Sequence, residues 1–125
     1  MAGDDAVQFG LGEPDFQPPP IAIEAFTKAM NDGRNKYTTT AGHPALRRKI
    51  AEMWHHLVPS LDESNVCITM SGTNGLLDIF LALVQPGDNV LLPEPYFPLY
   101  PQDVVICGGE PNLYPCTFEN GFVPT

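Results

Sequence analysis

Residues 66–80 constrain the fold of this chain more than any other stretch, because two apolar patterns meet there. Residues 66–70 form a short β-rich apolar run, and a helical apolar pattern begins directly after Ser71, Gly72 and Thr73. A strand that opens straight into a helix leaves backbone N–H groups free at the positive end of the helix dipole, where a phosphate can bind. The alternative is an ordinary strand-to-helix connection, since every α/β protein contains several.

Helices and strands are expected to alternate along the chain. The predicted helices cover residues 20–31, 43–57, 73–84 and 99–107, and the predicted strands cover residues 66–70, 89–93 and 111–116. This alternation predicts an α/β fold with a mainly parallel sheet. Residues 1–20 are expected to be irregular, and no linker or repeat divides residues 1–125. The first helix is expected to bury a stripe of Ala22, Phe26 and Met30.

Charge and composition disfavour several classes of function. Fifteen acidic residues against six basic ones give a net charge of −9, which opposes binding to nucleic acid or to an anionic membrane. No apolar run reaches the ~20 residues of a membrane span, and no leader pattern opens the chain. The three cysteines lack CxxC spacing, so we expect reduced thiols in a cytoplasmic protein. No spacing of His and Cys predicts a metal site.

Several short motifs follow one another in a fixed order. They are GLGEPDF at residues 10–16, KYTTTAGHPALR at 36–47, SGT at 71–73, PGD at 86–88, PYF at 95–97, GG at 108–109 and ENGF at 119–122. Any one of them is weak, but in this order they resemble the class I and II pyridoxal-phosphate-dependent aminotransferases of fold type I. The resemblance runs from about residue 9 to the last residue. It implies a partial three-layer α/β/α large domain with a mainly parallel sheet, of which this chain would be the N-terminal half.

The resemblance also implies a cofactor, pyridoxal 5′-phosphate, which the protein holds and orients. In the family the SGT turn binds the cofactor phosphate, which assigns that role to Ser71, Gly72 and Thr73. The aromatic residue after Pro-Tyr stacks on the cofactor ring, which assigns that role to Phe97. From its local pattern alone, Phe97 would instead be a core aromatic residue between a loop and a helix.

Two residues nearer the N-terminus receive roles from the same resemblance. Tyr37 would reach the cofactor phosphate of the other subunit in a homodimer, and Gly12 would lie beside the substrate carboxylate. Without the resemblance, Tyr37 would pack under the following helix and Gly12 would be a turn glycine. Arg47 is expected to be a structural helix residue with a charged partner, and Asp15 a turn or capping residue.

No catalytic residue is assigned, because the lysine that forms the Schiff base in the family has no counterpart. Lys28, Lys36 and Lys49 all have the pattern of surface side chains. In the family's sheet, strand 66–70 would lack a neighbour, so the chain is expected to be an incomplete segment that tends to self-associate.

The predicted function is therefore that of a segment of a transaminase, which moves an amino group between an amino acid and a 2-oxo acid. The isolated chain is expected to be inactive. A related pyridoxal-phosphate lyase, such as a carbon–sulfur lyase, and a non-catalytic α/β interaction domain are the alternatives.

Overall fold

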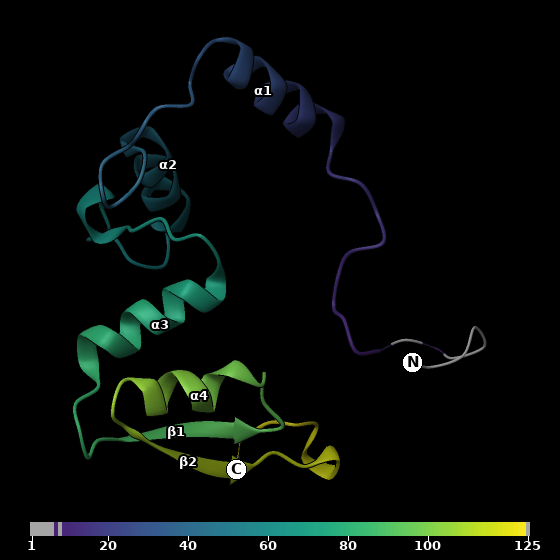
Figure 1. The fold of residues 1–125 in the computed structure, drawn as a ribbon, viewed down its shortest axis with the longest axis vertical. Coiled ribbons are helices and arrows are strands. Elements are labelled where there is room, and N and C mark those ends of the chain that lie inside the picture. Colours follow the sequence, from purple (N-terminus) through teal and green to yellow (C-terminus); the bar gives the residue numbers. More distant parts are fainter. Residues whose placement is uncertain (1–6, 8, 125) are drawn as a thin grey trace. The chain divides into compact units, whose positions relative to one another are not determined.

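The computed structural model describes residues 7 and 9–124 of the chain (Figure 1). Its elements are α1 (Pro20–Asn31), α2 (Pro44–Trp54), the 3-10 helix η1 (Glu63–Asn65), α3 (Gly72–Leu83), β1 (Asn89–Glu94), α4 (Leu99–Ile106), β2 (Glu110–Pro115) and the 3-10 helix η2 (Phe118–Asn120). Residues 1–37 and residues 38–125 form two separate compact units. The first unit contains α1, and the second contains all the other elements.

Helix α1 forms over the predicted residues because a proline begins it and a glycine follows its end. Pro20 occupies the first turn, where its missing N–H group costs no hydrogen bond, and Gly33 adopts a φ of +73° just beyond the helix. No residue of α1 is buried. The expected buried stripe of Ala22, Phe26 and Met30 is therefore wrong for this structure, because α1 is the only helix or strand described in its unit.

Helix α2 begins where the sequence predicts and ends earlier than predicted. Pro44 stands in its first turn and Trp54 is its last residue, whereas residues 55–57 form a turn in place of the expected last helical turn. Ala51 is buried on the side of α2 that packs against η1. The α2–η1 contact is thus the first packed element of the second unit.

The predicted strand over residues 66–70 does not form. Val66 has extended backbone angles, with φ of −112° and ψ of 127°, but the segment joins no sheet among the described residues. The Ile68 N–H group donates instead to the carbonyl oxygen of Ala41 at 2.9 Å. Gly42, with φ of +99°, lies so close that a Cβ atom on it would stand 2.6 Å from the Ile68 Cβ. A strand requires a paired neighbour, and the Ile68–Ala41 bond is the one backbone hydrogen bond between this segment and a distant part of the described chain.

Strands β1 and β2 lie parallel and are connected by α4 (Figure 1). Six residue pairs stand opposite one another along the two strands. Val104 of α4 is fully buried, and Leu92 and Cys116 are nearly so. The β1–α4–β2 segment is therefore the best-packed part of the described chain. The parallel pair with its connecting helix confirms the predicted α/β class.

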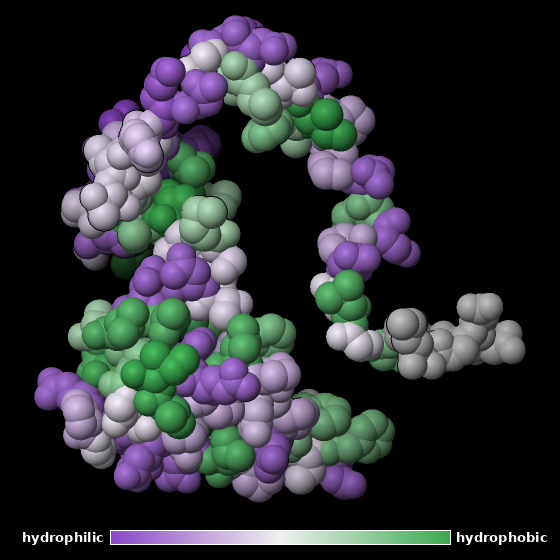
Figure 2. Space-filling model, in the orientation of Figure 1, coloured by the Kyte–Doolittle hydropathy of each residue, from purple (hydrophilic) through white to green (hydrophobic). Residues whose placement is uncertain are grey.

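Most large apolar side chains of the described residues remain exposed. Ile79, Leu81 and Leu83 of α3 and Val105 and Ile106 of α4 are each more than half exposed. Figure 2 shows hydrophobic side chains gathered over α3. Between residues 9 and 124, no helix is long and apolar enough to cross a membrane.

Candidate functional site

The turn that opens α3 is a capped helix start. Ser71 has an extended backbone, with φ of −162° and ψ of 167°, and its hydroxyl oxygen accepts the N–H group of Asn74 at 3.1 Å. This hydrogen bond satisfies one of the N–H groups that every helix leaves unpaired at its N-terminus. Helix α3 therefore begins at Gly72, one residue before the predicted start.

Two donors at this turn remain free. Among the described residues, neither the Gly72 N–H group nor the Thr73 N–H group has a hydrogen-bond partner. A Cβ atom on Gly72 would meet no heavy atom within 4 Å, so the space beside it is open. Free N–H groups at the positive end of a helix dipole favour an anion such as a phosphate. The geometry of the turn fits a phosphate group.

Three side-chain hydrogen bonds fix the shape of the turn. The Thr69 hydroxyl donates to the Ser71 carbonyl oxygen at 2.8 Å. The Asn74 side chain accepts the Met70 N–H group at 3.3 Å and donates to an Asp78 carboxylate oxygen at 3.3 Å. Each bond connects a residue of the turn to a neighbour only two to four positions away, so the turn is stabilised locally.

Two cavities lie along the extended segment that leads into the turn. Their volumes are 560 Å³ and 580 Å³, and Cys67, Thr69 and Asp78 line both of them. Gly72 lines the smaller one. The segment thus has open space beside it where a strand of a sheet would have neighbouring strands.

Phe97 lies in the loop between β1 and α4. Its side chain is 50% exposed, and its ring centroid is 5.6 Å from that of Tyr100 at an interplanar angle of 55°. Such exposure argues against the interpretation of Phe97 as a core aromatic residue. Phe97 does not line either cavity beside the α3 turn, so a site shared with Ser71 stays a prediction.

Tyr37 and Gly12 belong to the first unit, whereas Ser71, Gly72 and Thr73 belong to the second. The Tyr37 side chain is fully exposed and lines a cavity of 470 Å³ with Asn35 and Lys36. A Cβ atom on Gly12 would meet no atom within 4 Å. The roles expected for both residues stay predictions.

Arg47 has the structural role expected of it, but with different partners. Its guanidinium group donates to two backbone carbonyl oxygens, that of Val66 at 2.7 Å and that of Glu63 at 2.5 Å. The expected charged partner belongs instead to Arg48, whose Nε donates to a Glu63 carboxylate oxygen at 2.7 Å. Arg47 therefore connects α2 to the chain segment that precedes the α3 turn.

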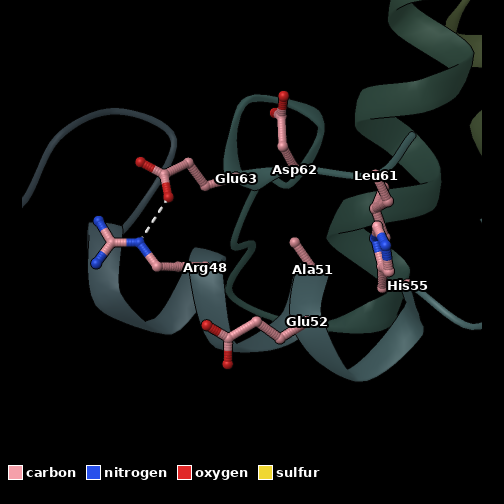
Figure 3. Close-up of a pocket in the computed structure, with 7 residues that line it drawn as sticks. All are labelled: Arg48, Ala51, Glu52, His55, Leu61, Asp62 and Glu63. Atoms are coloured by element: carbon pink, nitrogen blue, oxygen red, sulfur yellow. Dashed lines mark hydrogen bonds and ion pairs between the residues drawn. The ribbon is translucent and has the colours of Figure 1, made fainter. Parts of the chain in front are cut away.

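A cavity between α2 and the η1 loop was not anticipated from the sequence. Its volume is 390 Å³, and Figure 3 shows Arg48, Ala51, Glu52 and His55 of the α2 side around it. Leu61, Asp62 and Glu63 complete the lining. The residues predicted for cofactor binding do not line it.

Hydrogen bonds and charge pairing shift the pKa values of three residues that line this cavity. The hydrogen bond and charge of Arg48 lower the pKa of Glu63, and those of Glu63 raise the pKa of Arg48. Hydrogen bonds from Ser64 lower the pKa of Asp62, which caps η1, while Asn65 accepts the Asp62 N–H group at 3.1 Å. This reciprocal capping box is the sequence signal that would have revealed η1.

Two of the three lysines form exposed ion pairs within their own helical turns. Lys28 lies 2.6 Å from an Asp32 carboxylate oxygen, and Lys49 lies 3.3 Å from that of Glu52. Within residues 9–124, no group of three or more His, Cys, Asp and Glu side chains is arranged to hold a metal ion. The paired lysines have the environment of solvated surface side chains.

A family model described as aminotransferase class I and II matches residues 4–125 of this chain. The chain belongs to that family. The match confirms the resemblance seen in the ordered motifs, and enzymes of class I and II depend on pyridoxal 5′-phosphate.

Curated relatives of this family member cover nearly all of it. It is 38% identical over 121 residues to a probable aspartate/prephenate aminotransferase of Aquifex aeolicus, and the match spans 96% of this chain and 31% of the relative. It is 36% identical over 122 residues to the aspartate aminotransferase of Geobacillus stearothermophilus, spanning 97% and 31%. The chain therefore spans about a third of the length of these relatives.

Solved structures of aspartate aminotransferases have the same fold over the matched residues. The aspartate aminotransferase of Thermus thermophilus with maleate superposes with a TM-score of 0.86 at 35% identity, covering 92% of this chain and 30% of that one. The aspartate aminotransferase of Thermotoga maritima gives a TM-score of 0.89 at 28% identity, covering 97% and 32%. The fold type I assignment is confirmed for this partial α/β domain.

Proposed function

We propose that this chain supplies part of the cofactor site of a pyridoxal 5′-phosphate-dependent transaminase that moves an amino group between an amino acid and a 2-oxo acid. The observation that carries the proposal is the start of α3. There the N–H groups of Gly72 and Thr73 are unpaired and the space beside Gly72 is open, at the SGT motif of an aminotransferase-family chain. The chain would act as the first part of the large domain of a longer enzyme.

In this proposal the α3 turn holds the cofactor phosphate. The Gly72 and Thr73 N–H groups donate to phosphate oxygens, and the Thr73 hydroxyl adds a third donor. The Ser71 oxygen already accepts the Asn74 N–H group, so its own hydroxyl hydrogen is free to donate to the phosphate. Hydrogen bonds to a charged group are worth about 1.5–3 kcal/mol each, enough to anchor the cofactor at this end.

The remaining predicted residues orient the ring and the substrate. Phe97, which is half exposed after β1, would stack on the cofactor ring. Tyr37 would reach the cofactor phosphate of the partner subunit in a homodimer, and its full exposure suits that role. The Gly12 backbone would lie beside the substrate carboxylate.

When it is bound, pyridoxal phosphate supplies an electron sink for the bonds that change at the amino acid. The residues of this chain bind and orient that group. Lys28 and Lys49 pair with carboxylates on the surface, so neither is assigned a proton-transfer role. We expect the 125-residue chain to bind the cofactor without transaminase turnover.

The free thiols of Cys67, Cys107 and Cys116 support a reducing, cytoplasmic location.

The binding test uses pyridoxamine 5′-phosphate, which has no aldehyde and therefore forms no lysine adducts. Its affinity is measured by fluorescence anisotropy for the wild-type chain and for Gly72→Asp. An acidic residue in the first turn favours the helix, and the open space beside Gly72 accommodates a side chain, so the fold is retained while phosphate is repelled.

We expect Gly72→Asp to weaken binding at least about tenfold, which corresponds to about 1.4 kcal/mol of repulsion between the added carboxylate and the phosphate. The matched control is Gln102→Glu, which adds the same charge to α4 and leaves the affinity unchanged. Equal affinity in wild type and Gly72→Asp would refute the proposed phosphate site.

A further inference from the structure

We propose that Thr69 is a positioning residue for phosphate binding, and that Gly75 makes its position possible. This inference rests on the proposed function of the α3 turn. In this inference the Thr69 side chain does not donate to the phosphate; its hydroxyl donates to the Ser71 carbonyl oxygen. It acts through the peptide group that joins Ser71 to Gly72, which carries one of the two free N–H donors.

The argument begins with the geometry of that peptide group. A trans peptide is planar, so the Gly72 N–H bond points in the direction opposite to the Ser71 C=O bond. Whatever fixes the Ser71 carbonyl therefore also fixes the direction of the Gly72 N–H group. Two donors hold this carbonyl, the Thr69 hydroxyl at 2.8 Å and the Gly75 N–H group at 3.0 Å.

The two donors have different origins. The Gly75 bond is the first hydrogen bond of α3, and any helix would form it. The Thr69 bond comes from outside the helix, and it resists rotation of the peptide away from its observed plane. With both in place, the Gly72 N–H group is directed out of the helix N-terminus before any anion arrives. Such preorganisation raises affinity because little ordering remains to be done on binding.

Gly75 provides the space that this contact requires. A Cβ atom on Gly75 would stand 3.2 Å from the Thr69 hydroxyl oxygen and 3.7 Å from its methyl carbon. The shorter distance is tighter than ordinary van der Waals contact, so a side chain at position 75 would push the hydroxyl away from the Ser71 carbonyl. The sequence thus pairs a hydroxyl at position 69 with the absence of a side chain at position 75.

Thr69 also lines both cavities beside the turn, as Cys67 and Asp78 do. Removing the hydroxyl leaves the Ser71 carbonyl with only its helix bond.

The test compares three variants of the 125-residue chain, with pyridoxamine 5′-phosphate as the probe and inorganic phosphate as a competitor. Thr69→Val removes the hydroxyl at nearly constant shape, and Thr69→Ser keeps it. Thr39→Val is the matched control, because Thr39 donates a similar bond to the Gly42 carbonyl at 2.7 Å, away from the turn. Fluorescence anisotropy gives the affinity, and urea unfolding followed by circular dichroism gives the stability of each variant.

We expect Thr69→Val to weaken binding of both probes about fivefold, the usual effect of one neutral hydrogen bond, while Thr69→Ser retains wild-type affinity. Thr39→Val should change stability as much as Thr69→Val does and leave affinity unchanged. A purely structural role predicts the same affinity change in both valine variants. That result, or wild-type affinity in Thr69→Val, overturns the inference.

The outcomes also separate this inference from the function on which it rests. If the wild-type chain binds neither probe, or if Gly72→Asp binds as well as wild type, the phosphate site itself is refuted and Thr69 has nothing to position. If Gly72→Asp abolishes binding and Thr69→Val does not change it, only the positioning role fails. Gly75→Ala gives an independent check, since it should weaken binding in the same direction with the hydroxyl still present.

Discussion

Gly42 lies against Ile68, in the segment that leads into the α3 turn. Gly42→Ala is therefore the most informative single test of how that segment is held. Its φ of +99° is unfavourable for any residue with a side chain. The added Cβ atom would also stand 2.6 Å from both the Cβ and the Cγ1 atoms of Ile68. A Cβ atom is fixed to its backbone and cannot rotate away, so the segment around Ile68 must move.

The expected cost follows from these two effects. Backbone strain at positive φ costs about 1–2 kcal/mol, and overpacking of this kind about 1–3 kcal/mol, so the substitution should cost about 2–5 kcal/mol locally. The hydrogen bond from Ile68 to the Ala41 carbonyl is the contact that breaks. Amide hydrogen exchange at Ile68 should therefore accelerate at least about 30-fold, or reach the rate of an unprotected amide.

Gly87→Ala is the matched control for this experiment. Gly87 has a nearly equal φ of +92° in the same unit, but a Cβ atom there would meet nothing within 4 Å. It therefore introduces the strain without the clash, and exchange at Ile68 should stay within about twofold of wild type. Unchanged exchange in Gly42→Ala, or equal acceleration in both variants, would refute the reasoning.

Three further predictions concern residues 38–125. Arg47→Met removes two charge-assisted bonds to carbonyl oxygens, at a cost of about 3–6 kcal/mol, and should speed amide exchange across residues 63–66. Arg48→Met removes one exposed ion pair and should leave that exchange nearly unchanged; equal effects of the two substitutions would contradict this. The pKa values of Asp62 and Glu63 are lowered, so the stability that these carboxylates contribute is present above their ordinary pKa values and is lost as the pH falls through the lowered ones. NMR titration should therefore give a midpoint below the ordinary value for each carboxyl group, and ordinary midpoints would rule out the capped arrangement of η1. Because so many large apolar side chains are exposed, sedimentation of the purified chain should show self-association, and a monomer with a sharp unfolding transition would be the contrary result.

Local signals in the sequence predicted the helices better than the sheet. Pro20 and Pro44 begin α1 and α2 where expected, because helix starts depend on residues within a few positions. The segment 66–70 has the composition of a strand but forms none, since a strand depends on partners far along the chain and the described chain offers this one a single backbone bond, to Ala41. The end of α2 at Trp54 was missed because the apolar pattern continues to residue 57.

The candidate site was predicted in its parts and not as a whole. The free donors of Gly72 and Thr73 follow from the helix start alone, which the motif indicated. The hydrogen bond from Thr69 to Ser71 depends on side-chain conformations that no spacing reveals. The relation of Phe97 to the turn depends on tertiary packing, so the sequence predicted it only through resemblance.

The short sequence separation between β1 and β2 affects the order in which parts of the chain fold. Asn89 pairs with Glu110 only 21 residues later, and Val104 between them is fully buried. Contacts this close in the chain form early, because little loop entropy is lost in closing them. We therefore expect the β1–α4–β2 segment to fold before parts of the chain whose contacts span longer distances.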